Sequence, residues 1–400
     1  MHIDRFQMER EQSLYENDVD YNLSESGVLP ISVNELIEGV ADPDEILNLS
    51  LKYAPSNGSL QLREHVATFY EGARADNVLV SNGSSEANFV SMWALLEKGD
   101  RVACMVPNYM QTWGLGRHFG SASDTYRLVE RREGGRARWA LDVASFERAV
   151  TRKTKLIVVT NPNNPTGAVL TEEEMDIIVR AARRVNAWIL SDEVYRGAEL
   201  SGGLSPTFWG RYDKVLVVAG LSKAFGMPGL RLGWIIAPPA TVQKIWSYQD
   251  YTTLTPNMLS DKLATIAMEP GKRKQLLART HSILNRNLPR LEEWIRGHGE
   301  IFSFIRPVAG AITTVRYSLP ISPRSLFNRL RLERSVLLTV GPHHGLGRYI
   351  RIGYGYDLDR TLEGLAIVSE FIKKLRKAPA RTGKTTRSVA SRRTAVPAHA

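Results

Sequence analysis

Short runs of apolar and β-branched residues recur through the middle of the chain. They lie at residues 78–80, 102–106, 156–160, 188–190 and 215–218. A run that is apolar throughout, without polar alternation, is typical of a strand buried on both faces of a sheet. The pattern therefore predicts a set of interior strands.

Helical patterns separate several of these runs. The clearest begins at Thr171, with Glu174 at the spacing of a capping box, and continues with Met175, Ile178 and Ala182 at helical spacing. Strands that alternate with helices predict an α/β fold, with a mostly parallel central sheet covered on both faces. Ligands of such sheets bind at the carboxyl ends of the strands, so the residues that follow each run are candidates for a site.

The pattern changes from about residue 283, where Arg-rich helical stretches begin. Strand candidates at 312–317 and 349–352 and a last amphipathic helix at 362–375 predict a second, smaller α+β domain. We expect four parts: an N-terminal arm with part of the small domain at 1–45, a large domain at 46–282, the C-terminal small domain at 283–376, and a basic tail at 377–400. The tail is too poor in apolar residues to pack, so we expect it to be disordered.

Composition narrows the class of partner. The net charge is +10, but residues 377–400 hold six basic and no acidic residues, so the remainder is only mildly basic and we expect neither nucleic acid nor a membrane as partner. No apolar run reaches membrane-spanning length, and the N-terminus lacks the apolar region of a signal peptide. The single cysteine, Cys104, leaves no intrachain disulfide or Cys-rich metal site. These features predict a cytoplasmic protein without a bound metal.

The strongest chemical signal follows the apolar run at 215–218. It reads GLSKAFGMPGLRLG from Gly220 to Gly233, with Lys223 among small residues and Arg231 eight positions later. A lysine alone is usually a solvated surface residue. This string, however, resembles the lysine-attachment motif of class I/II aminotransferases, which are fold-type I enzymes dependent on pyridoxal 5'-phosphate (PLP). The resemblance implies that Lys223 holds PLP as a Schiff base and later acts as a general base.

The resemblance also implies a binding site for the PLP phosphate. The run at 78–80 leads into Gly83, Ser84 and Ser85 and then into a helical pattern, and helix N-termini bind anions. Ser222 and Arg231 would complete this phosphate site. Gly220 departs from the family, because many relatives have a serine three residues before the lysine. Taken alone, the segment after the run at 78–80 has a less favoured alternative, an ordinary strand-turn-helix corner.

Four further residues match the family's positions around the cofactor ring. Asp192 would hold the proton on the pyridine nitrogen, and Tyr195 and Asn164 would hydrogen-bond the phenolic oxygen. Tyr109, in Pro-Asn-Tyr, would stack on the ring and take part in catalysis. Asn164 belongs to the turn sequence NPNNPTG, in which one Asn-Pro bond is expected to be cis. Without the resemblance, Asp192 would be interpreted as a cap or turn residue and Tyr109 as a core or interface residue.

The resemblance extends from Tyr53 to Arg351 and so covers most of the chain. Arg351 would bind the substrate carboxylate with its planar fork, together with Asn164 and the backbone of Gly27. Tyr53 is similar to a family tyrosine that reaches the phosphate of the neighbouring subunit, which implies a homodimer with shared active sites. As isolated residues, Arg351 would form a surface ion pair and Gly27 a turn.

These roles predict transamination between an α-amino acid and a 2-oxo acid. The alternative is a PLP-dependent lyase or cyclase that acts on an amino acid side chain, because the strings at 24–28 and 250–256 are similar to those of capreomycidine synthase, a family member that cyclises a hydroxylated arginine. Some PLP-binding domains serve as transcription regulators, and these carry a helix-turn-helix domain ahead of the PLP-binding domain. In this sequence the family match begins within the first few dozen residues, so we do not expect a regulator. The stretch 247–256 lacks an arginine and contains Asp250, which disfavours an acidic donor and hints at a cationic one.

Overall fold

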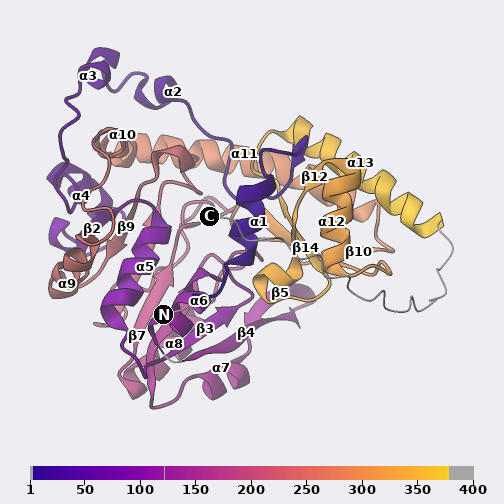
Figure 1. The fold of residues 1–400 in the computed structure, drawn as a ribbon, viewed down its shortest axis with the longest axis horizontal. Coiled ribbons are helices and arrows are strands. Elements are labelled where there is room, and N and C mark those ends of the chain that lie inside the picture. The colour runs from indigo at the N-terminus through magenta and orange to yellow at the C-terminus, as the bar shows by residue number, and fades with distance from the viewer. Residues whose placement is uncertain (1–2, 121, 378–400) are drawn as a thin grey trace, which may run out of the picture.

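The computed structural model describes residues 3–120 and 122–377 (Figure 1). Within these residues the centre of the fold is an eight-stranded sheet of order β2-β9-β8-β7-β6-β3-β4-β5. Strands β8, β7, β6, β3 and β4 run parallel, whereas β9 and β5 are antiparallel to their neighbours. The strand bounds are β2 (Val78–Ser81), β3 (Arg101–Val106), β4 (Ala122–Glu133), β5 (Arg136–Leu141), β6 (Thr154–Thr160), β7 (Trp188–Asp192), β8 (Val215–Gly220) and β9 (Gly233–Ile236).

The predicted interior strands are confirmed as β2, β3, β6, β7 and β8. Along β6, Leu156 and Val158 pack on one face of the sheet, and Ile157 and Val159 pack on the other. Both faces are therefore apolar, which explains the runs without polar alternation. The hairpin of β4 and β5 was not predicted, because its outer half carries exposed charged residues.

Helices cover both faces of this sheet. One face is covered by α5 (Ser84–Leu95), α6 (Gln111–Phe119) and α9 (Pro239–Gln249), and the other by α7 (Val143–Ala149) and α8 (Glu172–Val185). The capping box predicted for Thr171 and Glu174 begins α8. Helices α4 (Leu60–Ala67) and α10 (Met258–Met268) pack against each other beside β2, with a 3-10 turn at Ala75–Asn77.

The C-terminal part contains a smaller antiparallel sheet of order β10-β11-β14-β13. The predicted strands at 312–317 and 349–352 are β11 and β14, and the predicted last helix is α13. Helix α11 passes residue 283 without a break, so one helix joins the two parts, and the division into domains stays a proposal. The bounds are α11 (Pro270–Arg296), β10 (Phe302–Phe304), β11 (Ile312–Tyr317), α12 (Pro323–Arg334), β13 (Thr339–Val340), β14 (Tyr349–Gly353) and α13 (Leu358–Lys377), with a 3-10 turn at Gly341–His344. A further 3-10 turn, Pro228–Leu230, lies between β8 and β9 of the large sheet. The predicted tail lies, from residue 378 onward, outside the described residues.

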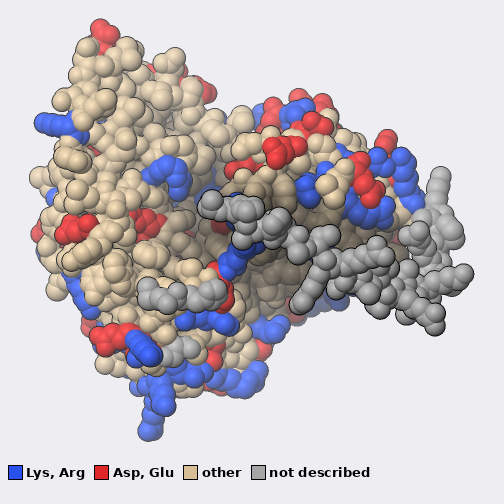
Figure 2. Space-filling view, in the orientation of Figure 1, with Lys and Arg blue, Asp and Glu red and all other residues tan. Residues whose placement is uncertain are grey.

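The N-terminal segment contacts both parts of the molecule. Strand β1 (Tyr21–Asn22) pairs in parallel with β12 (Val336–Leu337), and α1 (Gln7–Tyr15) lies between the large sheet and α12 (Figure 1). Helices α2 (Val33–Ile37) and α3 (Pro43–Leu47) then project from the body at the upper left of the view. The projecting segment carries few charged side chains on the face shown in Figure 2.

Candidate active site

A cavity of about 360 Å³ lies at the carboxyl ends of β6, β7 and β8. The N-terminus of α5, the strand β14 and the helix α1 close its other sides. Most of the predicted site residues line it: Ser84, Ser85, Tyr109, Asn164, Asp192, Tyr195, Ser222, Lys223, Arg231 and Arg351. Residues at or just after the carboxyl ends of β3, β6, β7 and β8 thus meet Arg351 of the smaller sheet in one place, as expected for the carboxyl edge of an α/β sheet.

Lys223 lies three residues beyond the end of β8. Its Nζ donates a hydrogen bond to Ser26 Oγ at 2.7 Å, and burial lowers the pKa of the ammonium. The departure at Gly220 has a steric reason, because a Cβ atom there would lie 2.9 Å from the Leu232 carbonyl oxygen. The close approach of β9 therefore requires glycine at this position.

Asp192 is the last residue of β7 and is buried. Its Oδ1 accepts a hydrogen bond from the Val194 N–H at 3.2 Å, and its Oδ2 accepts one from Asn88 Nδ2 at 3.4 Å. Burial raises the pKa of the carboxyl to about 6. Asn88 was not predicted, although its position one helical turn after Ser84 in α5 could have indicated it.

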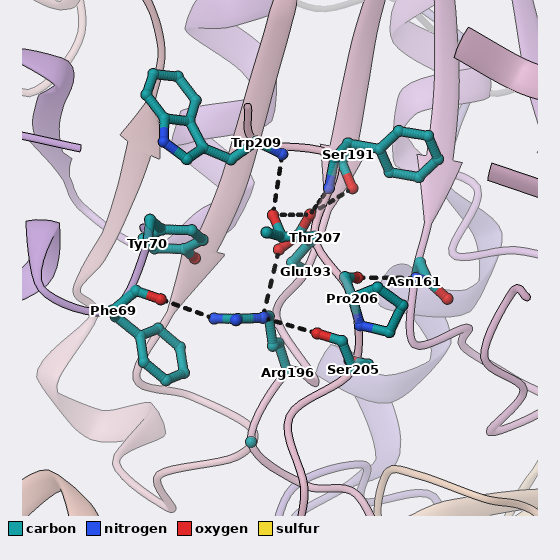
Figure 3. Close-up of polar contacts among 12 residues, drawn as sticks. Phe69, Tyr70, Asn161, Ser191, Glu193, Arg196, Ser205, Pro206, Thr207 and Trp209 are labelled. Carbon is teal, nitrogen blue, oxygen red and sulfur yellow. Dashed lines mark hydrogen bonds and ion pairs between the residues drawn. The ribbon is translucent and has the colours of Figure 1, made fainter. Parts of the chain in front are cut away.

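A buried polar network holds the segment that follows Asp192 (Figure 3). Glu193 Oε1 accepts hydrogen bonds from Ser191 Oγ at 2.9 Å, Thr207 Oγ1 at 2.9 Å and the Phe208 N–H at 3.1 Å. Arg196 donates to the carbonyl oxygens of Ser205 and Phe69. The network fixes both ends of the turn 192–196, and so orients Asp192 and Tyr195 toward the cavity.

The predicted phosphate site is a helix N-terminus beside a guanidinium. Helix α5 begins at Ser84, and Gly83 precedes it with φ 85°. A Cβ atom at Gly83 would lie 2.7 Å from Arg231 Nη2, so glycine leaves space between the backbone and this arginine. Arg231 also lies 3.5 Å from Ser222 Oγ through Nη1. Free N–H groups and a guanidinium together favour a dianion.

Tyr195 and Tyr109 both line the cavity. Tyr195 is 2% exposed, and its hydroxyl makes no hydrogen bond of ordinary geometry within the described residues. Tyr109 contacts the ring of Phe6 edge-on, with 4.8 Å between the ring centroids. Burial, and to a smaller extent the nearby Glu9 carboxylate, raises the pKa of the Tyr109 hydroxyl. A buried hydroxyl without a partner indicates that this cavity is shaped for a ligand.

Arg351 reaches the same cavity from β14. Its Nη1 donates to Asn164 Oδ1 at 3.1 Å, and its Nη2 donates to the Ser24 carbonyl oxygen at 2.5 Å. The Nε has no hydrogen-bond partner in the described part of the chain, and burial lowers the pKa of the guanidinium. The loop that carries Ser24 continues to Gly27, where a Cβ atom would lie 2.9 Å from the Ser222 carbonyl oxygen. Gly27 thus lies against the lysine segment rather than lining the cavity.

Two residues that the sequence singled out lie elsewhere. Tyr53 is 81% exposed and does not line the cavity of its own chain, so its role stays a proposal about a second subunit. Asp250, the residue after α9, is exposed and also lies outside this cavity, so its hint of a cationic substrate has no support within one chain.

The turn sequence NPNNPTG contains two cis peptide bonds, Asn161-Pro162 and Asn164-Pro165, where one cis bond was expected.

Several lining residues were not predicted. They come mainly from α1 and the loop after β1: Met8, Glu9, Gln12, Glu16, Glu25, Ser26, Thr160 and Tyr356. Helix α1 carries no motif, and only its tertiary position brings it to the cavity. Within the described residues no cluster of His, Cys, Asp or Glu could hold a metal ion, and no helix there is both long and apolar enough to cross a bilayer.

A mostly parallel sheet with a lysine, a buried carboxylate and an anion site at its carboxyl edge defines a fold-type I, PLP-dependent enzyme. The sequence model described as aminotransferase class I and II matches residues 24–365, and the chain belongs to that family. Its cofactor is accordingly PLP. The resemblance inferred from the lysine motif is thus confirmed.

Relatives in the family differ in the reaction that their names give. The chain is 29% identical to capreomycidine synthase from Streptomyces vinaceus over 87% of this chain and 89% of the relative. It is 25% identical to an aspartate aminotransferase from Streptomyces avermitilis over 81% and 82%. A crystal structure of a PLP-dependent aminotransferase from Streptococcus suis aligns with a TM-score of 0.86 and 28% identity, over 94% of this chain and all of the other. These relatives thus share one family, whereas the reactions in their names differ.

Proposed function

We propose that the protein is a PLP-dependent aminotransferase that moves an amino group between an α-amino acid and a 2-oxo acid. The observation that carries this proposal is that Lys223 and Arg351 reach one cavity from different sheets. A cationic fork for a carboxylate and a buried amine that can accept a proton are what the reaction at an amino acid Cα requires.

The residues present fit PLP. The N–H groups at Ser84 and Ser85 with Arg231 would hold the phosphate, and the Tyr195 hydroxyl would donate to the phenolic oxygen. Asp192 would hold a proton on the ring nitrogen, where a buried carboxylate is needed. When bound, PLP supplies an electron sink for the bonds at Cα. The cavity provides a partner for each polar group of the cofactor.

Substrate binding and proton transfer then depend on side chains of the protein. Arg351 holds the α-carboxylate, and Asn164 keeps the guanidinium in place through the 3.1 Å hydrogen bond. Burial lowers the pKa of Lys223, which increases the fraction of neutral amine available to take the Cα proton. Helix α1 covers the cavity with Met8, Glu9 and Gln12, and so limits the access of water.

A second candidate is a lyase or cyclase that acts on the amino acid side chain. The similarity to capreomycidine synthase over 87% of the chain favours it. The same site could serve either reaction, because the fold does not determine the fate of the electrons stored in the cofactor.

We also propose a homodimer with shared active sites in the cytoplasm. Helix α3 has no buried residue, and Leu47, Leu51 and Tyr53 are at least 80% exposed. Large apolar side chains exposed on a projecting segment in this way are typical of a surface covered by a second subunit. The cytoplasmic assignment rests on the single cysteine, Cys104.

The two candidate reactions differ in their need for a second substrate. An aminotransferase given one amino acid should release one equivalent of 2-oxo acid per Lys223 and then stop, until a 2-oxo acid is added. Product measured by chromatography against enzyme concentration gives this ratio. The Lys223→Ala variant should release none, whereas Lys244→Ala, at an exposed residue, should match the wild type. Continuous product from one amino acid alone would contradict transamination and support the lyase or cyclase.

A further inference from the structure

Three carboxylates line the cavity in addition to that of Asp192. Glu9 and Glu16 come from α1 and the residue that caps it, and Glu25 comes from the loop after β1. Glu9, Gln12 and Glu16 are separated by three and four positions, so they share one face of the helix. The cavity thus has an acidic wall made of residues that no sequence motif indicated.

The acidic wall is held in place by contacts between α1 and the rest of the molecule. Gln12 Nε2 donates to Ser24 Oγ at 3.0 Å, which ties the helix to the loop that carries Glu25. On a different face Glu11 is 3% exposed and pairs with Arg324 and with His343 Nε2, the latter at 3.0 Å. These contacts fix the position of α1 and of the loop, and so of the three partly exposed carboxylates that line the cavity.

The position of Glu16 is electrostatically unfavourable without a cation nearby. It lies at the C-terminal end of α1, where the helix dipole disfavours negative charge. Burial and the neighbouring Glu25 and Glu9 raise the pKa of its carboxyl. A carboxylate placed against its own helix dipole and two like charges indicates a ligand that supplies positive charge.

The described lining residues contain three cations for such a role, Lys223, Arg231 and Arg351. Under the proposed function each has another partner: the cofactor's carbonyl carbon for Lys223, its phosphate for Arg231 and the substrate's α-carboxylate for Arg351. Asp192 is used by the ring nitrogen. Glu9, Glu16 and Glu25 then remain without a counter-charge among the described residues that line the cavity.

We propose that the amino acid substrate carries a cationic side chain, a guanidinium or an ammonium group, which Glu16 and Glu25 bind. Glu9 lies beside Tyr109 and contributes to the same negative potential. This inference rests on the proposed function, since it needs Arg351 and Lys223 to be occupied by the α-carboxylate and the cofactor. Unlike Asp250, which the sequence suggested as the contact for a cationic substrate, Glu16 and Glu25 line the cavity.

Binding to the Lys223→Ala protein incubated with PLP tests the inference without turnover. Calorimetry would give dissociation constants for L-arginine and its neutral isostere L-citrulline, and for L-lysine and L-norleucine. We expect each cationic amino acid to bind at least about tenfold more tightly than its neutral partner, as charge-assisted hydrogen bonds require. The larger of the two ratios identifies a guanidinium or an ammonium as the preferred group.

Charge variants make the test specific to the acidic wall. Glu16→Gln and Glu25→Gln should each reduce the arginine-to-citrulline ratio by about tenfold, the contribution of one charge-assisted pair. Glu147→Gln, at an exposed residue of α7, should leave the ratio unchanged. Equal binding of arginine and citrulline, or a ratio that Glu16→Gln and Glu25→Gln leave intact, would overturn the inference. The need for a second 2-oxo acid is measured separately, so failure of transamination would not be mistaken for failure of the cationic subsite.

Discussion

Asp192 is the residue whose surroundings most clearly determine its proposed chemical role. It is buried at the end of β7 and accepts hydrogen bonds from Val194 and Asn88, yet burial still raises the pKa of its carboxyl to about 6. A protonated ring nitrogen beside it would stabilise the carboxylate and be stabilised in return. The chemistry proposed for PLP depends on this one ion pair.

Asp192→Asn should therefore fold and bind PLP but lose most of its activity. The amide is isosteric but cannot hold the ring proton, so we expect kcat to fall by about two to three orders of magnitude, as for loss of a major electrostatic stabiliser. Steady-state kinetics and cofactor content measured on the same preparation give both quantities. Asp213→Asn, at an exposed residue, is the matched control. Turnover of Asp192→Asn close to that of the wild type would refute the assigned role.

At the scale of elements, the end of β7 depends on a second buried carboxyl. Glu193 accepts three hydrogen bonds, and burial raises its pKa from 4.5 to about 7 (Figure 3). The folded state thus holds a proton on Glu193 more strongly than the unfolded chain does. Its contribution to stability is complete below the unfolded pKa of 4.5 and is lost as the pH rises through about 7.

We expect Glu193→Gln to flatten the pH dependence of unfolding in this window. The amide keeps an oxygen that can accept from Ser191, Thr207 and Phe208 but carries no titratable proton. Urea unfolding of the cofactor-free protein between about pH 5 and pH 8 would give free energies of unfolding for both forms. The wild type should lose stability relative to the variant as the pH rises. Parallel curves for the two proteins would show that Glu193 does not titrate in this range.

For the whole molecule, the projecting segment of α2 and α3 is the feature that one chain leaves unexplained. Leu36 and Ile37 of α2 are buried, but Leu47 and Leu51 are at least 80% exposed, and Figure 2 shows few charges on the segment. Tyr53 follows the same segment and does not reach its own cavity. A second subunit that covers this surface would account for both observations.

Leu51→Glu should weaken the proposed dimer. Leu51 is 84% exposed in the single chain, so the change would be neutral for a monomer, whereas a buried unpaired carboxylate at an interface costs several kcal/mol. Sedimentation equilibrium of the variant should show monomer at concentrations where the wild type is dimeric. Leu332→Glu, on α12 at 70% exposure, controls for the added charge and should stay dimeric. A monomeric wild type would contradict the homodimer directly.

The sequence by itself determined the interior of the large sheet and the cofactor site built on it. Strands β2, β3, β6, β7 and β8 are apolar on both faces, and this signal is local. Lys223, Asp192 and Asn164 lie at or after the ends of such strands. Because ligands bind at the carboxyl ends of parallel strands, the sequence alone predicted that these residues lie together. Local patterns also marked α8 through its capping box and Gly83 before α5.

Only the tertiary structure brought Glu9 and Glu16 to the cavity. Glu9 and Glu16 lie in a short helix without a motif, and they reach the cavity because β1 pairs with β12 and Glu11 pairs with Arg324 and His343, more than 300 residues away. Asp250 is the opposite case. Its place in the sequence hinted at a contact with a cationic substrate, but the residue is exposed and lies outside the cavity. The physical reason is that secondary-structure periodicity and strand-end rules are local, whereas charge complementarity depends on contacts that only the folded chain brings together.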